Sequence, residues 1–221
     1  MQHLIRQLPT PIEVAIVVGL AFGYATLGSI FSLFSESAGP PITQGHLMSL
    51  LIYEGCVMLI LCVFLSARGW TLKAIGFTPD FRGAVEGTGI AAGTYFLLSF
   101  FWLPVAALLP ELHSSATSTE LVAKGLPIAL IAAVSLLNPL FEELFVCGYV
   151  ISAVEKTNGL TTAVNASVGI RMLYHMYQGP AVLSVILLGL VFGLFYAKTR
   201  RLWPLVVAHG LFDFVSLLSA T

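Results

Sequence analysis

Long apolar runs alternate with short polar or Gly/Pro-containing segments along the whole chain. A membrane-spanning helix needs about 20 mostly apolar residues, and seven segments approach or reach this length. They are residues 13–34, 47–65, 85–109, 125–151, 160–177, 181–197 and 203–219. The pattern predicts an all-α, polytopic transmembrane helix bundle with about seven spans. The chain shows no tandem repeat and no low-complexity linker, which indicates a single membrane-embedded domain, residues 1–221.

The fifth segment is the most polar of the seven, because it contains Asn165, Ser167, Arg171 and His175. Polar groups that face hydrocarbon without a partner cost several kcal/mol each. We therefore expect this segment to be buried among the others. The first segment is long enough to span and is not followed by a convincing cleavage site, so we expect an uncleaved anchor.

Composition agrees with a membrane protein: 57% of the residues are hydrophobic and 10% are charged, whereas soluble proteins have about 25% charged residues. The formal net charge of −1 and the lack of a basic arm exclude a nucleic-acid partner. The three cysteines, Cys56, Cys62 and Cys147, lie in apolar segments and are odd in number, which argues against a disulfide framework. No cofactor is expected.

The distribution of Lys and Arg predicts the orientation, because cytoplasmic loops are enriched in these residues. A cytoplasmic N-terminus leaves one basic residue, Lys124, in the outside segments. The inside segments then hold Arg6, Arg68, Lys73, Arg82, Lys156, Lys198, Arg200 and Arg201. Trp70 lies among these charges and is expected at the depth of the lipid headgroups. The compact chain suggests an integral protein of a prokaryotic plasma membrane.

Two adjacent carboxylates, Glu142 and Glu143, lie inside the fourth apolar segment. A charged side chain at the centre of a bilayer costs roughly 2.5–3.5 kcal/mol on insertion scales, so such residues need partners and usually mark function. The candidate partners in the last third of the chain are Arg171, His175, His209 and Asp213.

Helical spacing places these residues in pairs, because residues four apart share a face. Asn138 shares a face with Glu142, Arg171 with His175, and His209 with Asp213. The sequence therefore predicts a polar cavity among the fourth, fifth and seventh segments. Glu54, in the second segment, fits either a position near the membrane surface or the lining of this cavity.

Three motifs in order carry a family resemblance: Glu142 to Gly148 (EELFVCG), Tyr174-His175, and His209 to Asp213 (HGLFD). Together they resemble the CPBP family of CAAX prenyl proteases and bacteriocin-processing or immunity proteins, also called the Abi family, whose best-understood branch is Rce1-type. The resemblance covers about 80 residues, and the family-like core extends over residues 125–219. The first 120 residues are similar only in being hydrophobic.

The chain departs from the family pattern at two positions. Cys147 stands where the first motif has an arginine, and Arg171 stands where the second motif has an aromatic residue four positions before its histidine. One interpretation is that the cation has moved, so that Arg171 neutralises Glu143 across the helix interface. The alternative is that Arg171 extends to a headgroup or binds a backbone carbonyl.

The resemblance implies an intramembrane endopeptidase that hydrolyses a peptide bond with a glutamate-activated water. It implies Glu142 as general base, His175 beside it on the water, and His209, oriented by Asp213, as the donor to the oxyanion. Glu143 would be a structural anion. The substrate would be a prenylated C-terminal tail, a leader peptide or a membrane-protein segment. Glu142 lies about two thirds along the fourth segment, which runs from outside to inside in the assigned orientation, so we expect a water-filled opening nearer the cytoplasm.

Other interpretations remain open. The glutamates could form a structural ion-paired node, and the histidines could be satisfied core residues. A catalytically silent relative could act in bacteriocin immunity or as a partner of another membrane protein. Zinc is a further candidate, since His and Glu are common ligands, but the chain lacks a His-Glu-x-x-His helix signature, and we expect no metal. No Gly-x-Ser-x-Gly motif supports a serine protease.

Overall fold

The computed structural model describes residues 8–34, 42–117 and 125–220, and within these ranges the chain forms helices and no strand. The elements, in chain order, are α2 (Thr10–Ser32), α3 (Gln44–Ala67), α4 (Phe81–Leu108), α5 (Pro110–Thr117), α6 (Ile128–Glu142), the π-helix η1 (Glu143–Tyr149), α7 (Val150–Asn158), α8 (Leu160–His175), the 3₁₀ segment η2 (Met176–Ala181), α9 (Val182–Thr199) and α10 (Trp203–Ser219).

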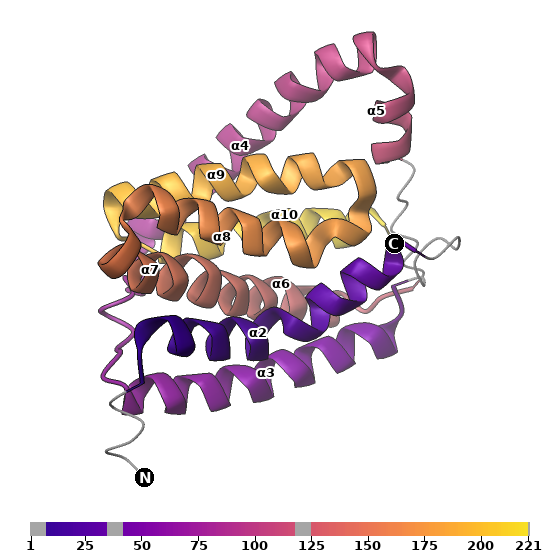
Figure 1. The fold of residues 1–221 in the computed structure, drawn as a ribbon. Coiled ribbons are helices and arrows are strands. Elements are labelled where there is room, and N and C mark those ends of the chain that lie inside the picture. Colours follow the sequence, from indigo (N-terminus) through magenta and orange to yellow (C-terminus); the bar gives the residue numbers. More distant parts are fainter. Residues whose placement is uncertain (1–7, 35–41, 118–124, 221) are drawn as a thin grey trace.

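Five helical stretches are long and apolar enough to cross a membrane, and α10 is a shorter apolar helix. The last of the five, Leu160–Thr199, divides at Gly179, whose φ of 56° and ψ of −133° are not helical. The two parts, α8 and α9, therefore pack side by side (Figure 1). Each predicted span thus corresponds to a helix, and the prediction of an all-α polytopic membrane bundle is confirmed.

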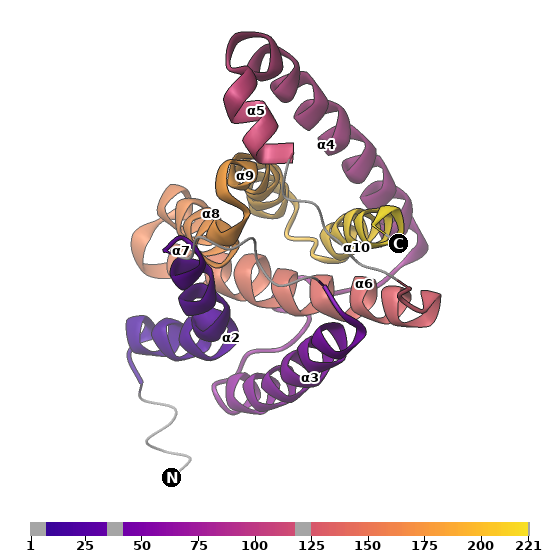
Figure 2. The same ribbon diagram turned by 90° about the vertical axis from the view of Figure 1, so that its right-hand side faces the viewer.

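The central helix of the bundle is α6, which contacts α3 on one side and α10 on the other (Figure 2). It continues through η1 into α7, which packs on α8, and α8 in turn packs on α2. Charged side chains lie inside this arrangement, whereas many large apolar side chains on the outside are exposed. This distribution is the one that a surrounding bilayer requires.

Close contacts at two glycines hold α10 in place. A Cβ on Gly87 of α4 would lie 2.5 Å from the carbonyl oxygen of Pro204, and a Cβ on Gly210 would lie 2.6 Å from that of Ser135 in α6. Only glycine permits such approach. Beyond Gly87, α4 leans away from α10 and exposes apolar side chains such as Phe96 and Phe100, and α5 then folds back to contact η2 (Figure 2).

Two expectations about the spans need correction. The fourth span continues to Asn158 rather than ending near residue 151, so Glu142 lies near the middle of the 31-residue helix Ile128–Asn158 and not nearer one end. The fifth span buries one face only: Ser167 and Arg171 are buried, but Asn165 is exposed. Its polar character is thus divided between an inner face and an outer face.

The basic residues used to orient the chain gather at one end of the bundle. Arg68, Lys156 and Arg200 line the same pocket there. Arg6 and Lys124 lie outside the described residues. The grouping agrees with placing these residues on one side of the membrane, and the assignment of that side to the cytoplasm stays a prediction.

Candidate active site

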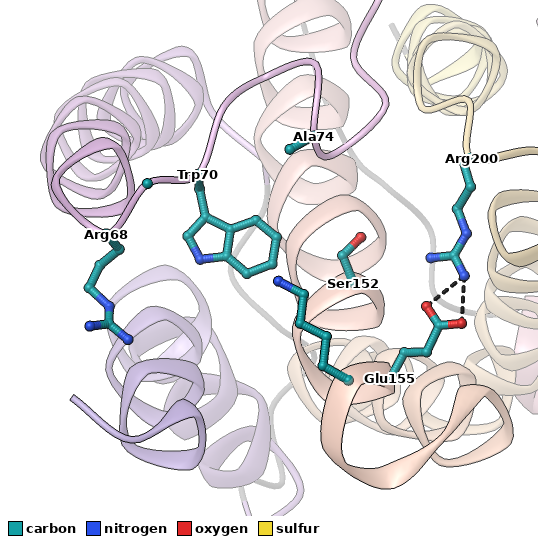
Figure 3. Close-up of a pocket in the computed structure, with 8 residues that line it drawn as sticks. Arg68, Trp70, Ala74, Ser152, Glu155 and Arg200 are labelled. Carbon is teal, nitrogen blue, oxygen red and sulfur yellow. Dashed lines mark hydrogen bonds and ion pairs between the residues drawn. The ribbon is translucent and has the colours of Figure 1, made fainter. Parts of the chain in front are cut away.

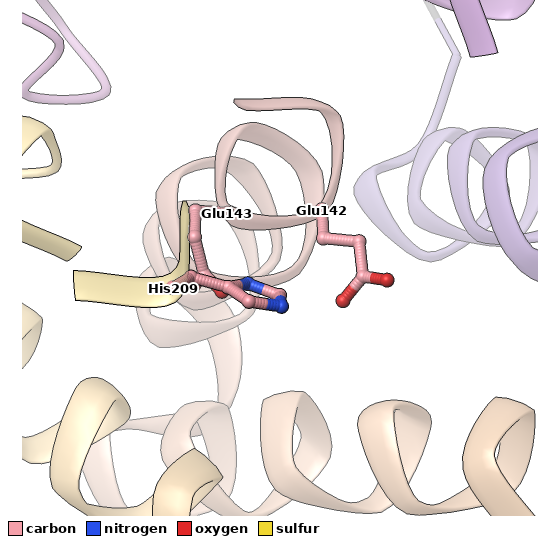
Figure 4. A group of neighbouring side chains, drawn as sticks. All are labelled: Glu142, Glu143 and His209. Atoms are coloured by element: carbon pink, nitrogen blue, oxygen red, sulfur yellow. The ribbon is translucent and has the colours of Figure 1, made fainter. Parts of the chain in front are cut away.

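Glu142 and Glu143 lie where the central helix changes from α to π geometry. Glu142 is the last residue of α6 and Glu143 is the first of η1, and every residue of η1 is buried. Short π-helical stretches inside α-helices occur frequently at functional sites. The two carboxylates point toward different neighbours, as Figure 4 shows.

Glu143 is fully buried between two cationic or potentially cationic side chains. Arg171 Nη2 lies 2.8 Å from both of its carboxylate oxygens, and His209 Nδ1 lies 2.7 Å from Oε1. The ion pair between α8 and η1 that the sequence suggests is therefore present. Its buried charges are stabilised by direct hydrogen bonds, as buried ion pairs require.

The guanidinium of Arg171 lies beside the side chain that replaces the arginine of the family motif. Its Nη2 is 3.9 Å from Cys147 Sγ. The stem of Arg171 passes Gly189 of α9, where a Cβ would lie 3.4 Å from Cδ. Arg171 therefore occupies the space that a long cationic side chain at position 147 would need.

Glu142 accepts hydrogen bonds from three side chains. Its Oε1 accepts from Asn138 Nδ2 at 3.2 Å, and its Oε2 accepts from Tyr174 Oη at 2.7 Å and from Arg171 Nη1 at 3.4 Å. An ionised carboxylate offers about four acceptor positions. One position is thus left for a further donor such as water.

The two histidines present different faces to the cluster. His175 Nδ1 donates to the carbonyl oxygen of Arg171 at 3.0 Å, because a carbonyl can only accept. This bond leaves Nε2 of His175 available. On α10, His209 donates through Nδ1 to Glu143, and its Nε2 lies 3.6 Å from Asp213 Oδ1. Glu143 is thus the closer acidic partner of His209, and Asp213 is the more distant one.

The structure brings together Asn138, Glu142, Glu143, Arg171, His209 and Asp213 through direct contacts. His175 joins them through the backbone of Arg171 and through Tyr174, whose ring centroid is 4.5 Å from that of His175. All of these residues lie within residues 124–215, which match the family described as type II CAAX prenyl endopeptidase Rce1-like. This match agrees with the resemblance to the CPBP family that the three motifs carry, and residues 124–215 are called the Rce1-like region below. No curated protein and no solved structure matches the chain.

The Rce1-like region has polar contacts that the sequence pattern did not reveal. Tyr174 provides the shortest hydrogen bond to Glu142, although in the sequence it is only the residue before the histidine of the second motif. Glu54 of α3, outside the Rce1-like region, is buried, and its Oε1 accepts from Asn138 Nδ2 at 3.1 Å. Asn138 therefore links the carboxylates of Glu54 and Glu142. The sequence shows that Glu54 is an acid in an apolar span and therefore needs a partner. It does not identify that partner, because Asn138 lies 84 positions away.

Glu142, Glu143 and His209 each offer one ligand atom, and these atoms lie within 4.8 Å of one another. Such a set of carboxylate and imidazole donors could in principle hold Zn²⁺. In the Rce1-like region, however, both oxygens of Glu143 already accept from the guanidinium of Arg171. A divalent ion there would be repelled by that cation, so the donor set fits a metal poorly.

Proposed function

We propose that the protein is an intramembrane endopeptidase that hydrolyses a peptide bond with a water activated by Glu142. The observation that carries the proposal is the environment of this carboxylate. Three donors fix it at the middle of a membrane-spanning helix, one acceptor position stays free, and two histidines belong to the same cluster. A fixed carboxylate with a free acceptor position is suited to take a proton from water.

The remaining residues have distinct proposed roles. His175, with Nε2 available, shares the water with Glu142. His209 lies between Glu143 and Asp213, so its ring nitrogens can donate both to Glu143 and toward a developing oxyanion. Glu143 and Arg171 are positioning residues, because they orient His209 and Glu142 and have no direct role in bond cleavage. Asp213 supports the charge on His209.

A prenylated C-terminal tail is the first substrate class to test, because the family description names CAAX prenyl endopeptidases. Leader peptides and membrane-protein segments are the other classes. A catalytically silent relative that acts by binding is the alternative function. Its main support was the missing arginine at Cys147, and the position of Arg171 beside Cys147 weakens that support.

The test uses the full chain in liposomes and a fluorogenic peptide that ends in a prenylated CAAX sequence. We expect cleavage by the wild type and a loss of roughly 100-fold or more in Glu142→Ala and His175→Ala, as for removal of a general base or its partner. The matched control is Glu111→Gln, which changes an exposed acid on α5. Equal cleavage by all four proteins, or normal cellular function in a Glu142→Ala strain, would contradict the proposal.

Chelators separate the glutamate mechanism from the zinc alternative. Because Arg171 already pairs with the carboxylate that a metal would need, we expect 1,10-phenanthroline and EDTA to leave the cleavage rate unchanged. Inactivation by chelator with recovery on addition of Zn²⁺ would assign the cluster to a metal instead.

A further inference from the structure

A pocket of about 560 Å³ lies at the end of the bundle where the basic residues gather. Its polar and aromatic lining comprises Arg68, Trp70, Ser152, Glu155, Lys156 and Arg200 (Figure 3). The volume falls in the range of small-molecule sites, roughly 300–1,000 Å³. Ser152 follows Glu142 by ten residues, about 15 Å along a helix, so the pocket is separate from the candidate active site.

Two cationic side chains of the pocket have hydrogen-bonding capacity to spare. Lys156 is exposed, and its amine lies 3.9 Å from the centroid of the Trp70 ring. Within the described ranges it has no hydrogen bond or ion pair. Arg200 holds both oxygens of Glu155 with Nη2 alone. Arg68 differs from both, because it is bound to Glu13 and to the carbonyl oxygen of Leu8.

The backbone fixes Arg200 at the edge of the pocket. Arg200 has a left-handed conformation, with φ 56° and ψ 27°, which is unfavourable for a residue other than glycine. Close packing maintains it: a Cβ on Gly76 would lie 2.0 Å from the carbonyl oxygen of Arg200, and Leu202 N donates to Gly76 O at 2.9 Å. The segment around Gly76 thus fixes the backbone of Arg200, and with it the position from which the guanidinium extends.

We propose that this pocket binds the headgroup of an anionic phospholipid that carries hydroxyl groups, such as phosphatidylglycerol. Lys156 and Arg200 supply donors for the phosphate. Glu155, and the hydroxyl of Ser152, can accept from the headgroup hydroxyls, which explains an acid among the cations. Trp70 is a residue type enriched at headgroup depth, and basic pockets between transmembrane helices on the cytoplasmic side bind other anionic headgroups, such as that of cardiolipin.

The binding test needs no peptidase activity and is therefore independent of the proposed function. The full-length protein, delipidated in detergent, is incubated with phosphatidylcholine vesicles with or without phosphatidylglycerol, and bound lipid is counted by native mass spectrometry. We expect retained phosphatidylglycerol in the wild type and about fivefold less in Lys156→Ala and in Arg200→Gln, the effect of one basic residue near a membrane surface. The control Lys198→Ala removes an exposed charge that does not line the pocket and should retain wild-type binding.

A second arm offers glycerol 3-phosphate, which has a phosphate and two hydroxyl groups, as the lipid headgroup has, but no acyl chains. We expect it to bind more weakly than the lipid, because the acyl chains hold the headgroup at the bilayer surface. Equally tight binding of glycerol 3-phosphate would assign the pocket to a soluble phosphate and overturn the lipid assignment. Equal retention of phosphatidylcholine, or equal lipid binding by the two pocket variants and the control, would overturn the proposal altogether.

Discussion

Arg171 neutralises the carboxylate cluster of the central helix from a neighbouring helix. It contacts Glu143 at 2.8 Å and Glu142 at 3.4 Å, and it lies 3.9 Å from Cys147. The cation beside Glu143 thus comes from α8, and not from the position one turn after the second glutamate, where the family motif has its arginine. The cluster therefore keeps a cation beside Glu143, although this cation is on a different helix from the arginine of the family motif.

This arrangement predicts a rescue between positions 147 and 171. Arg171→Ala should lower stability by about 3–5 kcal/mol, because it leaves a buried carboxylate without its ion-pair partner. Cys147→Arg in the same chain should restore much of that loss, whereas Cys147→Arg alone should destabilise by placing two guanidinium groups in one space. Thermal unfolding in detergent and peptide cleavage measure both effects.

The matched control for this exchange is Arg82→Ala, which removes a cation whose side chain is 83% exposed and should leave stability unchanged. If Arg171→Ala is as stable and active as the wild type, or the double variant is no better than Arg171→Ala, the cation has not been relocated.

Tyr174 predicts a separable effect on catalysis. Tyr174→Phe removes the 2.7 Å donor to Glu142 and keeps the ring that stacks on Phe22. Because Glu142 loses the donor that holds it in position, kcat should fall about 10-fold or more, whereas the lost hydrogen bond should lower the free energy of unfolding by no more than about 1.5–3 kcal/mol. Tyr95→Phe, on the exposed part of α4, is the control. Unchanged kcat in Tyr174→Phe would remove this hydroxyl from the proposed mechanism.

Some of these residue-level relations could be predicted from the sequence, and others could not. The pairing of Asn138 with Glu142, and of His209 with Asp213, follows from the four-residue repeat of a helix. The contacts of Tyr174 with Glu142, and of Asn138 with Glu54, depend on how two helices cross, which no local pattern specifies. The pairing of Arg171 with Glu143 could be proposed from the sequence, because Cys147 replaces the arginine of the first motif and Arg171 is a basic residue within a neighbouring apolar segment.

The helices themselves were predictable because each span is a long apolar run with polar or glycine-containing ends. The short helix α5 was not predicted, since eight residues without an apolar run carry little signal. The π-helical geometry of η1 was not predicted either. Its residues have the same apolar pattern as an ordinary buried helix, and packing decides between the two forms.

The crossing of α4 and α10 predicts that alanine at Gly87 and alanine at Gly89 affect stability differently. Gly87→Ala should destabilise the fold by about 1–3 kcal/mol, because its Cβ would overlap Pro204 and Val207. Gly89→Ala, two positions away, meets nothing within 4 Å and should leave stability equal or raise it by about 0.5–1 kcal/mol. Thermal unfolding of both variants in one detergent provides the comparison. Equal effects would mean that α4 does not pack on α10 at this position.

At the scale of the molecule, another buried acid, Glu13, joins the first helices to the helix that carries the candidate active site. Glu13 of α2 accepts from Arg68, from Trp70 Nε1 at 2.8 Å and from Tyr149 Oη at 2.8 Å. Tyr149 is the last residue of η1. The N-terminal helices are therefore fixed directly to the segment that begins with Glu143, although the family resemblance does not extend to them.

Orientation in the membrane is testable at the two ends of the bundle. With the basic end in the cytoplasm, a membrane-impermeant maleimide should label Glu111→Cys in intact cells and should label Thr157→Cys only after the membrane is opened. Both positions are exposed, and Cys56→Ser removes the exposed native thiol. If only Thr157→Cys is labelled in intact cells, the protein has the opposite orientation to the one predicted.

Because Arg171 and the two glutamates lie on different helices, we expect the position of Arg171 to affect insertion of the protein into the membrane. During synthesis, the span that contains Glu142 and Glu143 emerges from the ribosome before α8, and its own basic residue, Lys156, is near its far end. Two unpaired carboxylates add roughly 5–7 kcal/mol to its insertion on the translocon scale. An arginine at position 147 would remove part of that cost within a single helix. In this chain the cation is on α8, so we expect the fourth span to enter the lipid more readily together with α8 than alone.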